Sequence, residues 1–187
     1  MAETDEHAAV LGEPRRLSKK RDRDLLKEAR RGSDEALEAL VAQHWHRAHR
    51  IAYGILGDPH IAEDVTQEAM ISVLANFGRF DTRRAFEPWL HRIVANRALD
   101  WARARARQEE ISRLVAPPAS AASPDPDLVA ALAGLTPDHR AVVVLRFVAG
   151  YGTGEIARML DIQRGTVGSR LRRGLDQLKT RLEDGDG

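Results

Sequence analysis

Residues 154–173 read GEIARMLDIQRGTVGSRLRR, a stretch with the pattern of two short helices joined by a tight turn. Ile156, Ala157 and Leu160 recur at the spacing that places side chains on one face of a helix. Ile162 lies in the expected turn, and the second helix has apolar side chains three and four residues apart, expected to face inward: Val167, Leu171, Leu175 and Leu178. The small side chain of Ala157 lets the two helices approach closely. The stretch therefore predicts a helix-turn-helix.

The second helix of this motif, called the recognition helix below, has side chains suited to DNA. Hydroxyl and guanidinium groups hydrogen-bond phosphates and guanine edges, and they occupy five positions expected to be exposed: Arg164, Thr166, Ser169, Arg170 and Arg173. An ordinary helix pair with a solvated basic face is the alternative. Six basic residues against one acidic residue between 162 and 181 favour DNA binding. We expect Arg170 to touch base edges and Arg173 a phosphate, because the recognition helix enters the groove by its N-terminal end.

Outward from this motif, the rest of the chain also has helical spacing. Residues 115–127, VAPPASAASPDPD, are rich in proline, alanine and serine and predict a flexible linker. Four short helices are expected after it: 128–133, 138–149, 155–160 and 165–182. No segment alternates with the period of a strand. The sequence therefore predicts an all-α protein with two small helical domains, at residues 22–114 and 128–187, and a mobile N-terminal tail at residues 1–21.

Turn and capping residues divide the N-terminal domain. Ser33 and Asp58 precede segments of helical spacing, where their side chains can accept hydrogen bonds from free backbone N–H groups. Pro59 suits the first position of a helix. Residues 78–87 lack helical spacing and predict a loop, and a further helix is expected from 88 to 114.

Several functional classes are disfavoured by composition. The chain has no cysteine, so disulfides, thiolate nucleophiles and Cys-based zinc sites are excluded. His44 and His46 point in different directions on a helix, and His49 has no carboxylate one turn away, so we expect no metal site. No catalytic triad, phosphate-binding glycine loop or paired-carboxylate cleft occurs, and we expect no enzyme activity and no cofactor. Without a signal peptide or a long apolar run, we expect a cytoplasmic protein with no membrane insertion.

Residues 62–81, AEDVTQEAMISVLANFGRFD, form the most specific stretch of the N-terminal domain. Asp64, Gln67 and Glu68 are three or four residues apart and share an exposed face, while apolar residues face the core. Taken alone, the stretch predicts only an amphipathic helix with a polar stripe.

Three segments in order resemble the sigma factor family of bacterial RNA polymerase. AEDVTQEAM resembles that family's polymerase-binding helix, and residues 86–100, FEPWLHRIVANRALD, resemble its promoter-melting helix. Residues 135–147, LTPDHRAVVVLRF, followed by EIARML and GTVGSRLRR, resemble its promoter-reading domain. The match covers about residues 24–182 and looks like the extracytoplasmic-function (ECF) group of the sigma-70 family, which keeps only the second and fourth conserved regions.

The resemblance implies a partner for each surface. Asp64, Gln67 and Glu68 would contact the β′ clamp helices of core RNA polymerase, and the C-terminal domain would also meet the β flap. The minus-10 element would meet residues of the loop and the helix after it: Phe80, Arg83, Arg84, Phe86, Asn96, Arg97, Asp100 and Arg103. The loop from Phe80 to Phe86 would hold a flipped-out base, and the recognition helix would bind the minus-35 element. The implied function is to direct polymerase to promoters and assist melting, with an anti-sigma protein as a further partner.

A few positions depart from the family pattern. Glycine replaces the usual lysine at Gly168, and Gln163 and Gly152 replace serine caps before two helices. Asp161 stands where glycine is common in the turn, and aspartate tolerates a left-handed backbone better than most residues. These changes put the affinity for the minus-35 element in question and leave the class of protein unchanged.

Chemistry and composition leave alternatives to parts of this assignment. Strand opening uses basic grooves and aromatic stacking surfaces, and arginines surround Phe77, Phe80, Phe86 and Trp89 in the sequence. Aromatic residues at helical spacing are more often core residues, which is the alternative for Phe86 and Trp89.

Two other functions are alternatives to a sigma factor. A helix-turn-helix regulator that binds DNA without melting it would not need the polar face at Asp64. A sigma mimic that binds an anti-sigma protein would not need a basic recognition helix.

Overall fold

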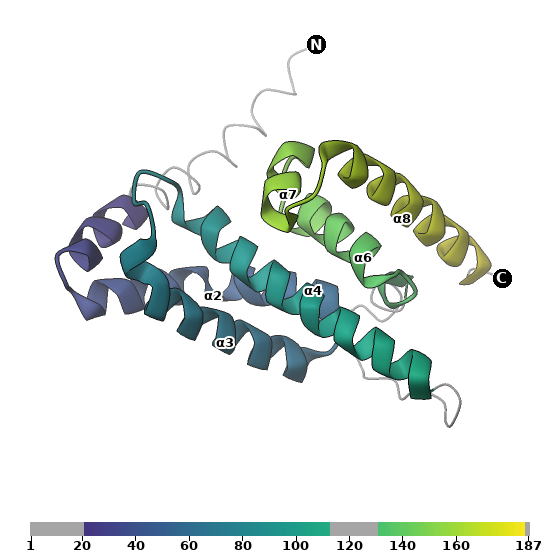
Figure 1. The fold of residues 1–187 in the computed structure, drawn as a ribbon, viewed down its shortest axis with the longest axis horizontal. Coiled ribbons are helices and arrows are strands. Elements are labelled where there is room, and N and C mark those ends of the chain that lie inside the picture. The colour runs from purple at the N-terminus through teal and green to yellow at the C-terminus, as the bar shows by residue number, and fades with distance from the viewer. Residues whose placement is uncertain (1–20, 113–130, 186–187) are drawn as a thin grey trace, which may run out of the picture.

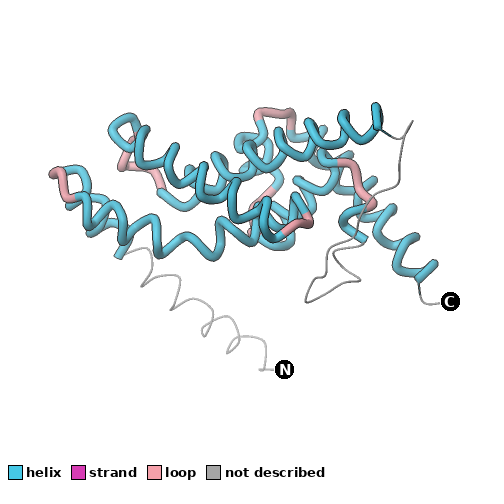
Figure 2. Tube along the Cα trace, turned by 90° about the horizontal axis from the view of Figure 1, so that it is seen from below, coloured by secondary structure: helices cyan, strands magenta, loops and turns pink. Residues whose placement is uncertain are grey.

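The computed structural model describes residues 21–112 and 131–185. Every regular element in these two ranges is helical, which confirms the all-α prediction (Figure 2). The expected linker at 115–127 and the tail up to residue 20 lie outside the described residues. Arg21, assigned to the tail from the sequence, is instead helical, as are all residues from 21 to 30. In the described ranges, no helix combines the length and apolar character needed to cross a bilayer.

The N-terminal unit contains three long helices, and the first two of them, α2 and α3, begin at the caps that the sequence predicted. Helix α2 (Asp34–Leu56) begins after Ser33, whose Oγ accepts a hydrogen bond of 3.1 Å from the N–H of Ala36. It ends at Gly57, which has a left-handed backbone with φ of 72°. Helix α3 (Pro59–Asn76) follows at once, because Asp58 Oδ1 accepts from the N–H groups of its first turn. A single 3-10 turn, η1 (Phe77–Arg79), extends α3.

Helices α2, α3 and α4 (Phe86–Ser112) lie side by side around one core (Figure 1). All the residues of α3 and its extension that were predicted to face inward are buried: Ala62, Val65, Ala69, Met70, Val73 and Phe77. Helix α4 begins two residues earlier than predicted, at Phe86, because this side chain is 1% exposed and packs into the core. The loop is therefore limited to residues 80–85.

The C-terminal unit contains the predicted helix-turn-helix. Helices α7 (Thr153–Leu160) and α8 (Arg164–Gly185) meet at Asp161, which has a φ of 53°, the left-handed conformation expected at this position. Glu155 closes the start of α7 by accepting a 2.8 Å hydrogen bond from the N–H of Gly152. Val167 is fully buried, as predicted, whereas Leu175 is 42% exposed, so its assignment to the inward face was wrong.

The helix predicted over 138–149 is divided in the structure. Helix α6 (Pro137–Val143) is capped by Thr136 as its sequence indicates, and a π-helical turn, η2 (Val144–Val148), replaces its second half. The N–H of Ala149 reaches back five residues to the carbonyl of Val144. Such single π turns are found mostly within α-helices and often at functional sites.

The two units pack against each other through α4. This helix contacts α2 and α3 on one side and α6 and α7 on the other (Figure 1). Buried residues of both units form one continuous apolar core, in which Val144 lies against the backbone of Gly54 in α2. The Arg140 guanidinium of α6 also donates a 3.0 Å hydrogen bond to the carbonyl of Ile55 near the end of α2. The sequence indicated two domains but not this interface between them.

Candidate nucleic-acid interface

Helix α3 presents a polar surface, called the α3 face below, formed by Asp64, Gln67 and Glu68. All three side chains are exposed on one side of the helix, opposite its buried residues, as the spacing predicted. Glu68 accepts a 2.9 Å hydrogen bond from Arg97 of α4, so the structure places this face beside the helix expected to meet DNA. Ile71 continues the face by one turn and is 66% exposed, an apolar neighbour that the sequence analysis did not single out.

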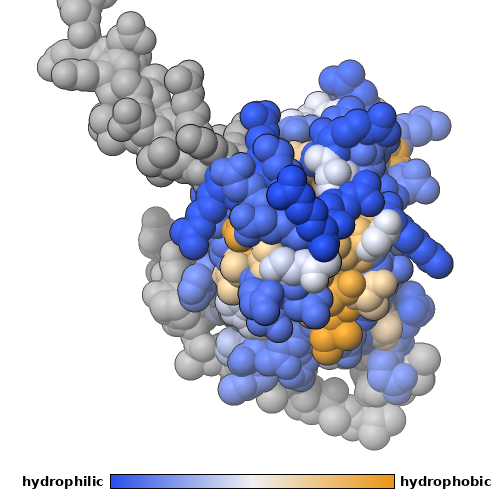
Figure 3. All heavy atoms as spheres, turned by 90° about the vertical axis from the view of Figure 1, so that its left-hand side faces the viewer, coloured by the Kyte–Doolittle hydropathy of each residue, from blue (hydrophilic) through white to orange (hydrophobic). Residues whose placement is uncertain are grey.

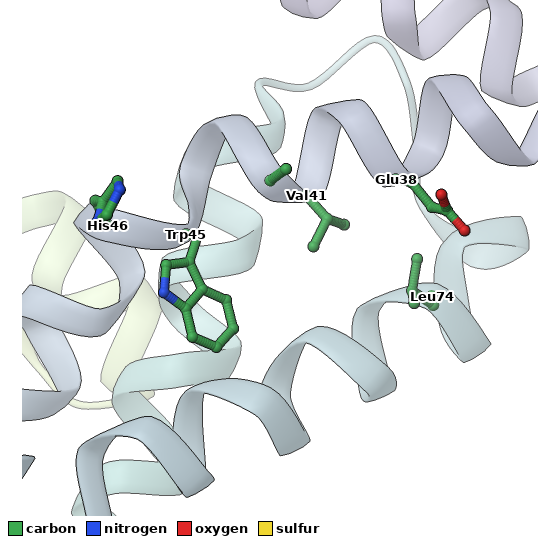
Figure 4. A pocket seen from close by; sticks show the side chains of 6 residues that line it. Glu38, Val41, Trp45, His46 and Leu74 are labelled. Carbon is green, nitrogen blue, oxygen red and sulfur yellow. The ribbon is translucent and has the colours of Figure 1, made fainter. Parts of the chain in front are cut away.

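A shallow apolar groove of about 380 Å³ runs between α2 and α3 near the end of α3. Val41 and Trp45 of α2 point toward α3, and Leu74 of α3 points back toward α2 (Figure 4). On the end of the molecule at the left of Figure 1, apolar side chains reach the surface in one small patch among hydrophilic ones (Figure 3). An exposed apolar groove next to a polar face is typical of a surface that binds another protein.

The loop at 80–85 is anchored by an aromatic cluster. The ring of Phe80 lies 4.6 Å from that of Trp89 and meets that of Phe86 edge to face at 5.8 Å. Phe80 and Phe86 are 3% and 1% exposed. In this conformation neither ring can stack on a base. Phe86, for which a core position was the alternative to base stacking, is a core residue here, and so is Phe80. The sequence did not separate these roles, because a buried and a stacking aromatic residue have the same pattern.

The most exposed charged side chains of this loop are basic. Arg83 and Arg84 are both more than 80% exposed. Asp81 shapes the loop by accepting hydrogen bonds from the backbone N–H and the guanidinium of Arg83, and the guanidinium bond is the main reason that the pKa of Asp81 is lowered. A cleft of about 580 Å³ separates the loop from the turn before α7, and four arginines are among its lining residues: Arg23, Arg47, Arg83 and Arg84. Three acidic residues also line this cleft, Asp22, Glu87 and Glu155, so its positive charge is concentrated at Arg83 and Arg84 on the loop, which can contact a nucleic-acid backbone.

Two of the minus-10 candidates on α4, Asn96 and Arg103, contact the C-terminal unit. Asn96 donates hydrogen bonds to the carbonyl of Arg92, at 2.8 Å, and to the carbonyl of Met159 in α7, at 2.9 Å. Arg103 donates a 2.7 Å hydrogen bond to Asp138 of α6, and its Nη1 lies 3.7 Å from Asp100. The structure therefore brings these residues together along α4, but turns part of that row toward α6 and α7.

The recognition helix divides into exposed and engaged residues. Arg164 and Arg173 are exposed, and Thr166 and Ser169 are half-buried. The Ser169 hydroxyl donates to the carbonyl of Thr166 at 3.0 Å, so its hydrogen is already used within the helix. Arg170 is turned inward. Its side chain is 23% exposed and its Nη1 lies 2.9 Å from Oδ1 of Asp138. No pattern in the sequence indicated this contact. In this conformation it directs the guanidinium group of Arg170 toward Asp138.

Asp138 therefore contacts two arginines from two different helices. Partial burial raises the pKa of its carboxyl, but the hydrogen bond from Arg103 and the charges of Arg170 and Arg103 outweigh burial, so the pKa lies below its ordinary value. The carboxylate is thus ionised at neutral pH and holds both guanidinium groups.

A buried polar pair lies at the same interface. Nδ1 of His91, on α4, is 2.7 Å from the hydroxyl of Tyr151, on the segment before α7. Burial lowers the pKa of His91 to about 4, which the nearby Glu87 carboxylate only partly opposes. His91 is therefore neutral at physiological pH. The two residues are sixty positions apart, so no local pattern could have predicted their contact.

The histidines weighed as metal ligands have other surroundings. His44 is buried, with its Nε2 3.2 Å from Asp22 Oδ2, a contact with the first described helix. The ring of His49 stacks on that of Tyr53, with 6.4 Å between the centroids. Within residues 21–112 and 131–185, no three histidine, aspartate or glutamate side chains are grouped to hold a metal ion.

Comparison with known proteins places both units. Residues 40–108 match the family described as Sigma-70 region 2, and residues 131–180 match Sigma-70, region 4. The chain is similar to the ECF RNA polymerase sigma factor SigE of Mycolicibacterium smegmatis, with 39% identity over 78% of this chain and 61% of the relative. It is also similar to the RNA polymerase sigma factor CarQ of Myxococcus xanthus, with 36% identity over 82% of this chain and 92% of the relative.

A solved structure shares the fold. The chain is similar to CnrH, determined in complex with the cytosolic domain of CnrY, with a TM-score of 0.67 and 27% identity over 89% of this chain and 99% of that one. The two matched segments include the loop and α4 on one side and α6, α7 and most of α8 on the other. Each candidate DNA surface therefore lies in a segment with a recognised counterpart.

Proposed function

This chain belongs to the sigma-70 family of RNA polymerase sigma factors, within its extracytoplasmic-function group, and we propose how its surfaces divide the work of transcription initiation. Residues 22–114 act as the unit that binds core polymerase and the minus-10 element. Residues 128–187 act as the unit that binds the minus-35 element. The proteins of this family regulate transcription, and the chain works in the cytoplasm, where core polymerase is found, without a catalytic step of its own.

The α3 face is the primary contact with core polymerase. The observation that supports this role best is that Asp64, Gln67 and Glu68 are exposed on a helix whose opposite side is fully buried. Complementary charge at a protein interface speeds association and selects the partner. The face meets the β′ clamp helices, and Ile71 adds apolar contact area at its end.

DNA is held by exposed arginines at two separate places. In the N-terminal unit, Arg83 and Arg84 flank the cleft beside the loop, and Asn96, Arg97, Asp100 and Arg103 follow along α4. Phe80 and Phe86 support the loop from the core. In the C-terminal unit, the recognition helix supplies its five polar residues to the minus-35 element. Guanidinium groups suit both phosphates and guanine edges.

An anti-sigma protein is a second class of partner. The similar protein CnrH was solved with the cytosolic domain of CnrY, and another structural neighbour, a sigma factor named RpoE, with an anti-sigma factor. The apolar groove beside the α3 face offers a partner of this kind a place for apolar side chains.

Reconstituted transcription tests the function. The purified chain, mixed with core polymerase and genomic DNA fragments, should produce transcripts with defined start sites that core polymerase alone does not produce. A helix-turn-helix regulator would bind DNA but give no new start sites. A sigma mimic would bind an anti-sigma protein and also give none, so either result would contradict the proposal.

A further inference from the structure

One carboxylate oxygen joins the two DNA-binding units. Oδ1 of Asp138, in the first turn of α6, lies 2.7 Å from Nη2 of Arg103 on α4 and 2.9 Å from Nη1 of Arg170 on α8. We call these three residues the Asp138 junction. Arg103 was assigned to the minus-10 element and Arg170 to the minus-35 element. The side chains are one quarter to two fifths exposed, so the junction lies at the edge of the interface, within reach of solvent.

The chemistry of the junction resembles that of a DNA contact. Arginine binds carboxylate and phosphate with the same planar arrangement of N–H donors. Arg103 donates a hydrogen bond to Asp138, so it has fewer donors left for a phosphate or a guanine. Arg170 Nη1 lies 2.9 Å from the same oxygen without a hydrogen bond, so this contact is an ion pair. Asp138 therefore engages Arg103 through a hydrogen bond and Arg170 through its charge.

Two other contacts also join α4 to the C-terminal unit. Asn96, a minus-10 candidate, donates to the carbonyl of Met159 in α7. His91 and the hydroxyl of Tyr151 form their buried pair nearer the start of α4. Each contact joins α4 to the C-terminal unit, so DNA cannot take the place of α7 beside Asn96 until the two units part.

We propose that Asp138 is an internal competitor of promoter DNA: its pair with Arg103 of the other unit holds the free chain closed, and its pair with Arg170 in its own unit engages a residue of the recognition helix. The inference rests on the proposed function, because it concerns the same DNA-binding residues. Partly exposed ion pairs are weak and exchange readily, so polymerase and promoter DNA can displace both pairs. The free factor is then a poor DNA binder. Separation of the units releases Arg103, and DNA itself displaces Asp138 from Arg170.

The full-length chain with Asp138→Asn tests the proposal by DNA affinity. Asparagine keeps the size of the side chain and removes its charge, and Thr136 still caps α6. The matched control is Asp176→Asn, which makes the same charge change at an exposed position of α8. With a short random-sequence duplex at low salt as the probe, the Asp138 variant should bind threefold to tenfold more tightly than the control. Equal affinities of the two variants would overturn the proposal.

A distance measurement provides the second readout. Because the chain lacks cysteine, two dyes can be attached at Ala75→Cys on α3 and Gln177→Cys on α8, both exposed positions. Energy transfer between them should fall in Asp138→Asn and also in Tyr151→Phe, which breaks the pair with His91 without changing charge or any DNA-binding residue. Unchanged transfer in both variants would overturn the closed state.

The same variants separate this inference from the function itself. If the parent chain starts transcription with core polymerase but Asp138→Asn binds the free duplex no better than its control, the competitor role is wrong and the function stands. If the parent chain gives no defined start site while Asp138→Asn still lowers energy transfer, closure stands and the assigned function is wrong.

Discussion

The α3 face and the DNA-binding side chains differ in what they contact within the free chain. Asp64 and Gln67 point to solvent with, at most, contacts to their own helix, and Glu68 has one partner, Arg97. Arg103, by contrast, is held by Asp138 across the interface between the units, and Arg170 pairs with the same carboxylate within the C-terminal unit. On the proposed assignments, this difference predicts an order of events, in which the surface for polymerase is ready first and the DNA surface of α4 is completed only after the units part.

The largest effect is expected at the ready surface. Asp64→Arg should leave helix content unchanged, because exposed substitutions shift stability by about 0.5 kcal/mol or less. Binding to core polymerase should weaken by about 2–5 kcal/mol, since a charge buried in the complex is reversed. Titration of labelled core polymerase measures the loss, and circular dichroism provides the control for folding. Equal binding by variant and parent would remove the α3 face from the polymerase contact.

An intermediate effect is expected from pH at the closed interface. His91 is neutral while buried against Tyr151, with Glu87, His44 and Arg47 as its charged or titratable neighbours, and its pKa is lowered to about 4. Above pH 6.5, the ordinary pKa of histidine, His91 is neutral in both the closed and the open state and does not oppose closure. As the pH falls from 6.5 toward 4, His91 takes up a proton only in the open state, so the closed state becomes progressively less stable relative to it. Over this window the loss amounts to about 3 kcal/mol, at 1.36 kcal/mol per pH unit.

The dye pair attached through Ala75→Cys and Gln177→Cys can follow this opening between pH 7.5 and 5. As the pH is lowered, energy transfer should decrease in the chain that carries only the two dye sites. The decrease should be much smaller when His91→Gln is added, because glutamine cannot take up a proton. Because the chain has seven histidines, the His91→Gln variant is needed to show that the pH dependence of energy transfer comes from His91. Constant energy transfer over the range, with His91 present, would show that His91 stays buried in all states.

The smallest effects distinguish two arginines of one helix. Arg173 is exposed in the free chain, whereas Arg170 is engaged with Asp138. In reconstituted holoenzyme, Arg170→Ala should cost about 1–3 kcal/mol on the preferred minus-35 sequence and reduce discrimination at one base pair. Arg173→Ala should weaken all sequences about equally and lower the salt slope by about one. The measurement is holoenzyme binding to single-base promoter variants at two salt concentrations.

The free chain gives the matching control for this pair. Because Asp138 already holds Arg170, Arg170→Ala should affect duplex binding by the free chain less than Arg173→Ala does. A uniform loss from both variants in holoenzyme would show that Arg170 does not read bases. An unchanged affinity in both would exclude α8 as the DNA reader.

Local chemistry made much of this molecule predictable. The caps at Ser33, Asp58 and Thr136, and the left-handed turn at Asp161, follow from the preferences of single residues and their neighbours. Helical spacing likewise placed Asp64, Gln67 and Glu68 on the exposed side of α3. Each of these features depends on residues within one or two turns, which is the range that sequence patterns describe.

Contacts between distant residues could not be predicted in the same way. The ion pair of Arg103 with Asp138 spans 35 positions, and the contact of Asn96 with Met159 spans 63. Neither leaves a periodic signal, and an arginine that meets a carboxylate looks the same in sequence as one that meets a phosphate. The exposure of Leu175 was missed for a related reason, because helical spacing identifies a face but not which of its positions a distant segment covers: Leu178, one turn further on, is buried.

Gly54 gives the interface an unusual sensitivity to size. A methyl group at this position of α2 would lie 3.0 Å from both terminal carbons of Val144 in the other unit. Alanine is a better helix former than glycine by about 1 kcal/mol, so selection for the strength of α2 alone would favour alanine here. That methyl group would strengthen one helix and press on Val144, which would have to give by a few tenths of an ångström. The absence of a side chain at Gly54 thus lets α2 and η2 approach closely, so the fit between the two units depends on the size of this one residue.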